Sequence, residues 1–256
     1  MGWHLAPFQR RAPEIQAFPV DLYVQQRDQD TDPPVHSLFV ANVLRYRRHD
    51  LGEVLEHAVW ALQAEVSKRT RDLVLLHAGV VSRAGGAVLI PASTGRGKST
   101  LVLALLQRGF SYLSDELGAI DPVTGLVYPY EKRIGVNEET LALFEDLGDR
   151  LQDRSELTVT MPKRYVRPED VGATTAGPSR PSGLVFLGED RSGAPRLAPI
   201  SRAEAVERMA RHSTNLFRYG ERGVIVLSRV AEGAPAYLLE GGTPAERAAL
   251  LDDRMD

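Results

Sequence analysis

The sequence predicts a fold of the α/β class, of the α+β kind, and three observations lead to this prediction. Two β-rich runs over 73–82 and 87–90 stand next to each other and are followed by a helical pattern over 99–108. Short β-rich runs then alternate with helical patterns towards the C-terminus. The chain has 256 residues, 43% of them hydrophobic, which is typical of one globular domain or one and a half.

Residues 1–70 differ from the rest, and we expect them to form a small strand and helix region packed on a core domain of residues 71–256. Short extended runs, the clearest over 38–46, are separated by a polar stretch over 25–34 that predicts a loop. Apolar residues at helical spacing predict an amphipathic helix over 51–68, with Asp50 and Glu53 as a capping box.

The elements of the core domain follow in order. A turn over 84–86 joins the first two strands, and Gly109 ends the helix that begins at Ser99. Polar residues without apolar periodicity predict a long loop over 150–182. The remaining elements are a strand over 110–113, a hairpin around 121–125, a helix over 137–147, strands over 183–187, 224–227 and 236–239, and helices from Ser201 and from Thr243 with capping boxes completed by Glu204 and Glu246.

Composition excludes several classes of function. The formal net charge is -3 and the sequence pI is about 6.1, so we expect neither nucleic acid nor a membrane surface as a partner. The absence of cysteine excludes disulfides, thiolate metal sites and a cysteine nucleophile. No run suits a signal peptide or a membrane span, and we expect a cytoplasmic protein.

The strongest motif is the stretch Ala92–Ser99, which matches the phosphate-binding pattern G-x-x-x-x-G-K-[ST] with Ala in the first position. A strand is expected before it and a helix after it, as this P-loop motif requires. Glycines let backbone N–H groups face phosphate oxygens, the lysine brings charge to the outer phosphates, and the serine hydroxyl can bind Mg²⁺. The residues expected to bind the nucleotide are Thr94, Gly95, Arg96, Gly97, Lys98, Ser99 and Thr100. The alternative is a glycine-rich turn that only caps a helix.

An acidic pair, Asp115 and Glu116, follows the strand after the motif. The C-terminal ends of strands in a wound sheet line the ligand crevice, so the pair and the motif are expected to be neighbours. One carboxylate can hold Mg²⁺ and the other can accept a proton from an attacking hydroxyl, and phosphoryl transfer to an alcohol uses both roles. In the alternative, Asp115 caps a turn and Glu116 faces solvent.

Taken together, LLHAGVVSRAGGAVLIPASTGRGKST, RGF and LSDELGAI resemble the catalytic core of HPr kinase/phosphorylase. They are still more similar to the smaller HPr-kinase-like proteins of ribosomal peptide biosynthesis, including kinases of lasso-peptide precursors. The resemblance covers about residues 73–136. It implies a fold like the nucleotide domain of phosphoenolpyruvate carboxykinase, and it makes a homo-oligomer plausible. The separate N-terminal domain of HPr kinases is not recognisable here.

The resemblance also implies residue roles. Asp115 would be the base towards a seryl hydroxyl, and Glu116 would take the place of an aspartate that binds Mg²⁺ together with Ser99. His77 matches a histidine on the strand before the loop and would lie close to the γ-phosphate, and Lys98 would be catalytic as well as phosphate-binding. A histidine on a buried strand is also compatible with a purely structural role. Lys132 and Arg133 are either phosphate or substrate contacts or a basic pair on the surface.

Two classes of function are compatible with these residues. The first is a kinase that uses ATP and Mg²⁺ to phosphorylate a Ser or Thr hydroxyl of a peptide or protein, as in a peptide-modification pathway; a reverse, phosphorylase-type reaction belongs to this class. The second is a nucleotide-binding module that a partner reads without any acceptor being phosphorylated. The acidic pair favours the kinase because a binding module does not need it. A basic stretch with Lys163, Arg164 and Arg167 either contacts substrate or is a solvated loop.

Overall fold

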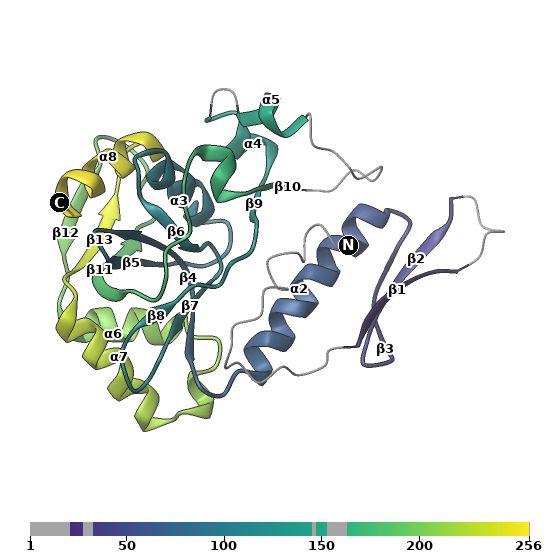
Figure 1. The fold of residues 1–256 in the computed structure, drawn as a ribbon, viewed down its shortest axis with the longest axis horizontal. Helices are drawn as coiled ribbons and strands as arrows, with labels where there is room; N and C mark the ends of the chain where they lie inside the picture. The colour runs from purple at the N-terminus through teal and green to yellow at the C-terminus, as the bar shows by residue number, and fades with distance from the viewer. Residues whose placement is uncertain (1–20, 28–32, 145–146, 153–162, 256) are drawn as a thin grey trace. The chain divides into compact units, whose positions relative to one another are not determined.

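The protein is described from a computed structural model, which covers residues 21–27, 33–144, 147–152 and 163–255 (Figure 1). The chain divides into two compact units, the first with residues 1–70 and 135–165, the second with residues 71–134 and 166–256. The expected boundary at residue 70 is therefore present. Residues 135–165, which the sequence placed in the core domain, instead group with the N-terminal region.

The first unit contains a small antiparallel sheet and a long helix. Strands β1 (Leu22–Arg27), β2 (Val35–Val40) and β3 (Val43–Arg48) pair in that order. Helix α2 (Leu51–Arg69) packs on the sheet, where Leu38 and Val40 meet Val54 and Ala58. Asp50 caps the helix by accepting a hydrogen bond from the Glu53 backbone N–H at 3.0 Å. The small sheet packed on a helix agrees with the expectation for this region. The single extended run expected over 38–46 is instead divided by a turn at 41–42 between β2 and β3, and residues 25–27 of the expected loop over 25–34 belong to β1.

The helix predicted over 137–147 is not continuous. It is replaced by α4 (Glu138–Leu141) and α5 (Leu147–Gln152). After Leu141 the backbone forms tight turns, in which Leu143 and Phe144 donate to carbonyls three residues before them. Short strands β9 (Ile134–Val136) and β10 (Arg164–Val166) pair with each other where the chain passes between the two units.

The second unit is built on one large mixed sheet, which confirms the α/β class. The strands are β4 (Val74–Arg83), β5 (Gly86–Pro91), β6 (Ser111–Ser114), β7 (Leu117–Ile120), β8 (Val127–Tyr128), β11 (Arg180–Leu187), β12 (Arg196–Pro199) and β13 (Ala236–Glu240). Their order is β12-β13-β11-β5-β4-β7-β8, with β6 also paired to β4. Strand β11 is parallel to both β5 and β13, whereas β4 is antiparallel to its neighbours.

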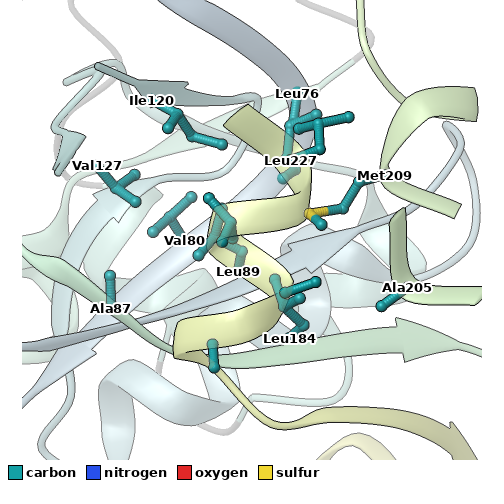
Figure 2. Packing of buried hydrophobic residues seen from close by; sticks show 14 of the residues in the cluster. Leu76, Val80, Ala87, Leu89, Ile120, Val127, Leu184, Ala205, Met209 and Leu227 are labelled. Carbon is teal, nitrogen blue, oxygen red and sulfur yellow. The ribbon is translucent and has the colours of Figure 1, made fainter. Parts of the chain in front are cut away.

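Helices cover both faces of this sheet. On one face, helices α6 (Arg202–Arg211) and α7 (Glu221–Gly233) bury Met209 and Leu227 against β4 and β5, as Figure 2 shows. On the other face lies α3 (Lys98–Gln107), which packs beside α8 (Pro244–Met255). Gly79 of β4 allows this close approach, because a Cβ there would lie 2.6 Å from a methyl carbon of Val102.

Two expectations for the second unit are wrong. Residues 224–227, Val-Ile-Val-Leu, were expected to be a strand, as such β-branched residues favour, but they lie in α7. Val226 and Leu227 are buried while Val224 and Ile225 are exposed, so tertiary packing of one helical face overrides β propensity.

The long loop expected over 150–182 is also shorter than predicted. Besides β10 it contains a 3₁₀ helix, η2 (Pro168–Val171), and its end belongs to β11. Backbone hydrogen bonds join Tyr112 of β6 to Thr174 and Ala176, so part of this segment follows the sheet. Residues 153–162 lie outside the described residues.

Candidate functional site

The Ala92–Ser99 loop leaves the end of β5 and enters α3, as its sequence predicted. Gly95 and Gly97 have φ of 80° and 85°, a left-handed conformation that favours glycine, and no atom lies within 4 Å of a Cβ built on either residue. Gly97 is the residue before α3, and no side chain caps this helix end. The first backbone N–H groups of α3 are therefore available to an anion.

Lys98 is buried at the start of α3, although it carries a charge. Only 6% of its surface is exposed, and its aliphatic stem passes over Gly79 of β4. The terminal Nζ lies 3.0 Å from Nε2 of His77. The fold therefore holds this ammonium group beside the loop before any ligand binds.

His77 joins the loop to the acidic pair. Its Nδ1 lies 3.1 Å from Oε1 of Glu116 and 3.2 Å from the Glu116 carbonyl oxygen. Because a lysine ammonium group only donates hydrogen bonds, Nε2 accepts from Lys98 and the ring proton is on Nδ1, facing Glu116. The Thr94 hydroxyl is a weaker neighbour, at 3.5 Å from Nε2. The contact between His77 and Lys98 was not predicted from the sequence.

Asp115 is the most buried carboxylate of the site, with 2% exposure. Its Oδ2 accepts a hydrogen bond from the Ser99 hydroxyl at 3.2 Å, which connects the acidic pair directly to the Ala92–Ser99 loop. Its Oδ1 lies 3.0 Å from Nζ of Lys132 and 3.2 Å from the Tyr112 hydroxyl. The acidic pair and the Ala92–Ser99 loop are therefore neighbours, as expected from the way strand ends meet at one edge of the sheet.

A tight turn after β6 directs the acidic pair. The Ser114 hydroxyl accepts hydrogen bonds from the backbone N–H groups of Glu116 and Leu117, at 3.0 and 2.9 Å. The hydroxyl of Tyr112, which is fully buried, accepts from the Asp115 N–H and donates to the Lys132 carbonyl oxygen at 2.9 Å. Burial and the nearby Asp115 carboxylate raise the pKa of Tyr112 well above its usual value, so this hydroxyl keeps its proton.

Glu116 is less buried than Asp115, with a side chain that is 27% exposed. Burial by itself would raise the pKa of Glu116. The hydrogen bond from His77 and the positive charges of Lys132 and Lys98 outweigh burial and lower this pKa from 4.5 to about 2. Glu116 therefore remains ionised at neutral pH.

Lys132 and Arg133 are not a basic pair on the surface. They are 7% and 8% exposed, and Lys132 also lies 3.8 Å from Oε2 of Glu116. The sequence did not reveal that Lys132 bridges the acidic pair, because the two sites are separated by the β7-β8 hairpin. Tyr130, two residues earlier, is close enough that Asp115 and Glu116, after burial, help to raise its pKa.

An exposed rim surrounds this buried network. Arg96 in the loop pairs with Glu189 at 2.7 Å, and Arg191 lies 3.5 Å from the Gly95 carbonyl oxygen. Both partners come from the segment between β11 and β12, whose Asp190 carbonyl accepts a hydrogen bond from the buried Arg247. Thr100 follows Ser99 within α3 and is half-buried. Sequence patterns gave no signal for the residues of this rim that lie beyond the loop.

A distant segment fixes the strand that carries His77. The backbone N–H of His77 donates to the His212 carbonyl oxygen at 2.7 Å, and Asn215, which is fully buried, bonds to the backbone of β4 at Leu73 and Leu75. Burial lowers the pKa of the His212 imidazole, and the positive charge of Lys98 acts in the same direction. His212 and Asn215 are further residues that the sequence did not indicate.

The basic residues Lys163, Arg164 and Arg167 do not share one role. Lys163 pairs with Glu56 at 2.7 Å and Arg164 with Glu138 at 3.3 Å, all within the first unit. Arg167 pairs with Asp170 of η2 in the second unit. Each of the three basic residues therefore forms an ion pair with an acidic residue of its own unit.

The donors of the acidic pair suit Mg²⁺, and phosphate oxygens would add further ligands to the metal. Among the described residues there is no group of three or more His, Asp or Glu side chains that could hold a metal ion. The Ser99 hydroxyl and the carboxylates of Asp115 and Glu116 are hard oxygen donors near the Ala92–Ser99 loop. Mg²⁺ is commonly bound by one or two carboxylates, with substrate phosphates and water completing its shell, so this donor set fits a metal–nucleotide complex.

Comparisons with known proteins do not add a name to this geometry. No protein-family model matches the chain, and no match is found among curated proteins. In the part of the chain that the structure describes, no helix is long and apolar enough to cross a membrane.

Proposed function

We propose that the protein is a kinase that binds ATP with Mg²⁺ on the Ala92–Ser99 loop and transfers the γ-phosphoryl group to a serine-type hydroxyl. The observation that carries the proposal is the 3.2 Å contact between the Ser99 hydroxyl and Asp115, because it joins a phosphate-binding pattern to a carboxylate pair. Phosphoryl transfer needs little covalent chemistry from the protein, and positioning and charge stabilisation supply most of the rate enhancement. The proposal includes the resemblance to HPr kinase, which implies a P-loop and a fold like that of phosphoenolpyruvate carboxykinase.

The residues divide the work as follows. Phosphate oxygens accept hydrogen bonds from the amides of Gly95, Arg96 and Gly97 and from the N-terminal end of α3. The Lys98 ammonium group faces the outer phosphates. His77 holds Lys98 on one side and Glu116 on the other. Bound Mg²⁺ would neutralise phosphate charge, with the Ser99 hydroxyl and a carboxylate as protein ligands. The acceptor is a Ser or Thr hydroxyl of a peptide or protein.

The two carboxylates can share the remaining roles in two ways. In the arrangement implied by the resemblance, Asp115 accepts the hydroxyl proton and Glu116 binds Mg²⁺. The Ser99–Asp115 contact and the greater exposure of Glu116 favour the reverse assignment, in which Asp115 binds Mg²⁺ and Glu116 accepts the hydroxyl proton. Asp115→Asn and Glu116→Gln, assayed over a range of Mg²⁺ concentrations, separate the two. The variant that needs more Mg²⁺ identifies the metal ligand, and the variant that loses rate at saturating Mg²⁺ identifies the proton acceptor.

The first test is ADP formation from ATP and Mg²⁺, with and without serine-containing peptides, for the wild type and Asp115→Asn. The proposal requires ADP that depends on the acceptor and disappears in the variant, whose nucleotide binding should persist. The second candidate is a module that binds nucleotide for a partner protein to read, and the open, uncapped end of α3 would serve it equally well. Nucleotide binding without turnover for any hydroxyl acceptor would favour that module over the kinase.

A further inference from the structure

Lys132 occupies a position that resembles that of a metal ion. Its Nζ lies 3.0 Å from Oδ1 of Asp115 and 3.8 Å from Oε2 of Glu116, and its side chain is 8% exposed. The same nitrogen donates to the Arg133 carbonyl oxygen at 3.2 Å. An ammonium group that bridges two carboxylates in this way satisfies the same negative charge that a divalent cation would satisfy.

The backbone keeps Lys132 at this position. The Tyr112 hydroxyl donates its one proton to the Lys132 carbonyl oxygen, and its oxygen accepts from the Asp115 backbone N–H, so one buried phenol holds both members of the ion pair. The lysine stem is long and has several rotatable bonds, which gives the ammonium group room to move while its backbone stays fixed.

We propose that Lys132 is an internal counter-cation that keeps the acidic pair charged and in place without metal, and that Mg²⁺ competes with it for these carboxylates. Two buried carboxylates without a cation would be costly, since each would lose its hydration. The ammonium group offsets this cost until a metal–nucleotide complex arrives. It is then free to turn towards phosphate oxygens. The proposal rests on the Mg²⁺ site of the proposed function, but it does not depend on phosphoryl transfer.

The test measures Mg²⁺ binding without nucleotide, by calorimetry and by the shift of the melting temperature. In Lys132→Gln the competing charge is lost, so the melting temperature without metal should fall and Mg²⁺ should bind at least about tenfold more tightly than in the wild type. Lys132→Arg keeps the cation and should bind Mg²⁺ as the wild type does. Lys68→Gln removes an exposed lysine that pairs with Glu65, and it should change neither quantity. Choline chloride at equal ionic strength controls for general screening.

Equal Mg²⁺ affinity in Lys132→Gln and the wild type would overturn the proposal, because the ammonium group would then not share the carboxylates with the metal. If Lys132→Gln folds only when Mg²⁺ is added, the proposal is supported. If Lys132→Gln does not fold at all, the double variant Lys132→Gln with Asp115→Asn tests whether the uncompensated charge of Asp115 prevents folding. Recovery of folding in the double variant identifies uncompensated charge as the cause. Failure to recover would mean that Lys132 acts through packing of its stem, and the proposal is wrong.

A failure of this proposal can be distinguished from a failure of the kinase proposal. Mg²⁺ affinity and melting temperature are measured without nucleotide or acceptor. A protein that never transfers phosphate can still show competition between Lys132 and Mg²⁺. Conversely, acceptor-dependent ADP formation with no change in Mg²⁺ affinity in Lys132→Gln would leave the kinase intact and remove only the counter-cation.

Discussion

The buried network and the exposed rim of the candidate site both contain ion pairs, but the pairs differ in their surroundings. In the buried network Lys132 and Asp115 are 8% and 2% exposed as side chains, and each makes a further hydrogen bond. In the rim, Arg96 of the Ala92–Ser99 loop pairs with Glu189, and their side chains are 45% and 85% exposed. An exposed pair contributes between 0 and about 1 kcal/mol, whereas breaking a buried pair costs about 3–5 kcal/mol because a charge is left without compensation.

This difference shows which parts of the site are fixed and which can move. Without a ligand, buried hydrogen bonds and ion pairs hold the charges around Asp115 and Glu116 in place, and the proposed kinase would use this arrangement with little reorganisation apart from Lys132. The arginines of the rim can exchange their present partners for phosphate oxygens at small cost. Substitutions in the buried network should therefore have large effects on stability and transfer, and substitutions in the rim should have small ones.

The largest effect is expected for Lys98→Met. Methionine keeps an unbranched stem over Gly79 but removes the ammonium group that we propose faces the outer phosphates. Loss of one such stabilising group reduces the rate of transfer by about 10²–10³-fold. Steady-state assays of acceptor phosphorylation measure this loss. Lys68→Met, at an exposed position on α2, is the matched control and should retain the wild-type rate. A similar rate in both variants would mean that Lys98 takes no part in transfer.

The next effect concerns Glu116 and the pH dependence of stability. Its pKa in the folded protein, about 2, is below the usual 4.5, so the ionised form stabilises the fold. This contribution is complete above pH 4.5 and is lost as the pH falls from 4.5 towards 2. It is on the order of 3 kcal/mol. Urea unfolding of the wild type from pH 5 to pH 2.5 should show this loss.

Glu116→Gln should abolish that part of the pH dependence. Glu207→Gln provides the control, because Glu207 is 59% exposed and pairs only on the surface with Arg211. Its pH profile should match that of the wild type. If Glu116→Gln also keeps the full pH dependence, the buried network is not what stabilises the ionised form of Glu116.

A third comparison uses two glycines with the same backbone conformation. Gly97 in the loop and Gly109 after α3 have φ of 85° and 88°, and both have open space around a built Cβ. Replacement by alanine should cost about 1–2 kcal/mol of stability in each case, because a left-handed φ is unfavourable with a Cβ. Only Gly97→Ala should also weaken nucleotide binding, as measured by calorimetry. Equal loss of affinity in Gly109→Ala would show that the effect is general destabilisation.

How much of the fold and of the candidate site could be predicted from the sequence depends on how far apart along the chain the interacting residues lie. Local signals were sufficient for the helix over 51–69, for the turn over 84–86 and for the capping box of the last helix, where Thr243 and Glu246 bond to each other. That the loop and the acidic pair are neighbours was also anticipated, since strand ends meet at one edge of a sheet, but the specific contact between Ser99 and Asp115 was not. The assignment of Val224–Leu227 as a strand was wrong, because only burial of one face against β11 favours the helix there.

Lys132 was beyond the reach of such signals. Its sequence context, Tyr-Glu-Lys-Arg, is typical of a polar surface segment. Its burial follows from the path of the chain after β8 and from the Tyr112 hydroxyl, neither of which leaves a pattern at residue 132. The same holds for Asn215, which supports β4 from 140 residues away along the chain. Side-chain partners that come together only through tertiary structure have no periodicity to detect.

The smallest effect is expected in the rim, for the pair of Arg96 and Glu189. A double-mutant cycle of Arg96→Ala and Glu189→Ala should give a coupling of no more than about 0.5 kcal/mol in unfolding experiments, since both side chains are well exposed. The pair of Arg211 and Glu207 on α6, whose side chains are 73% and 59% exposed, is the control. With nucleotide present, Glu189→Ala should bind slightly more tightly than the wild type, because Arg96 no longer has a carboxylate competing with phosphate. Glu207→Ala should not change this affinity. A coupling above about 1 kcal/mol for the Arg96 pair would place it with the buried network and remove the distinction between a fixed interior and an adaptable rim.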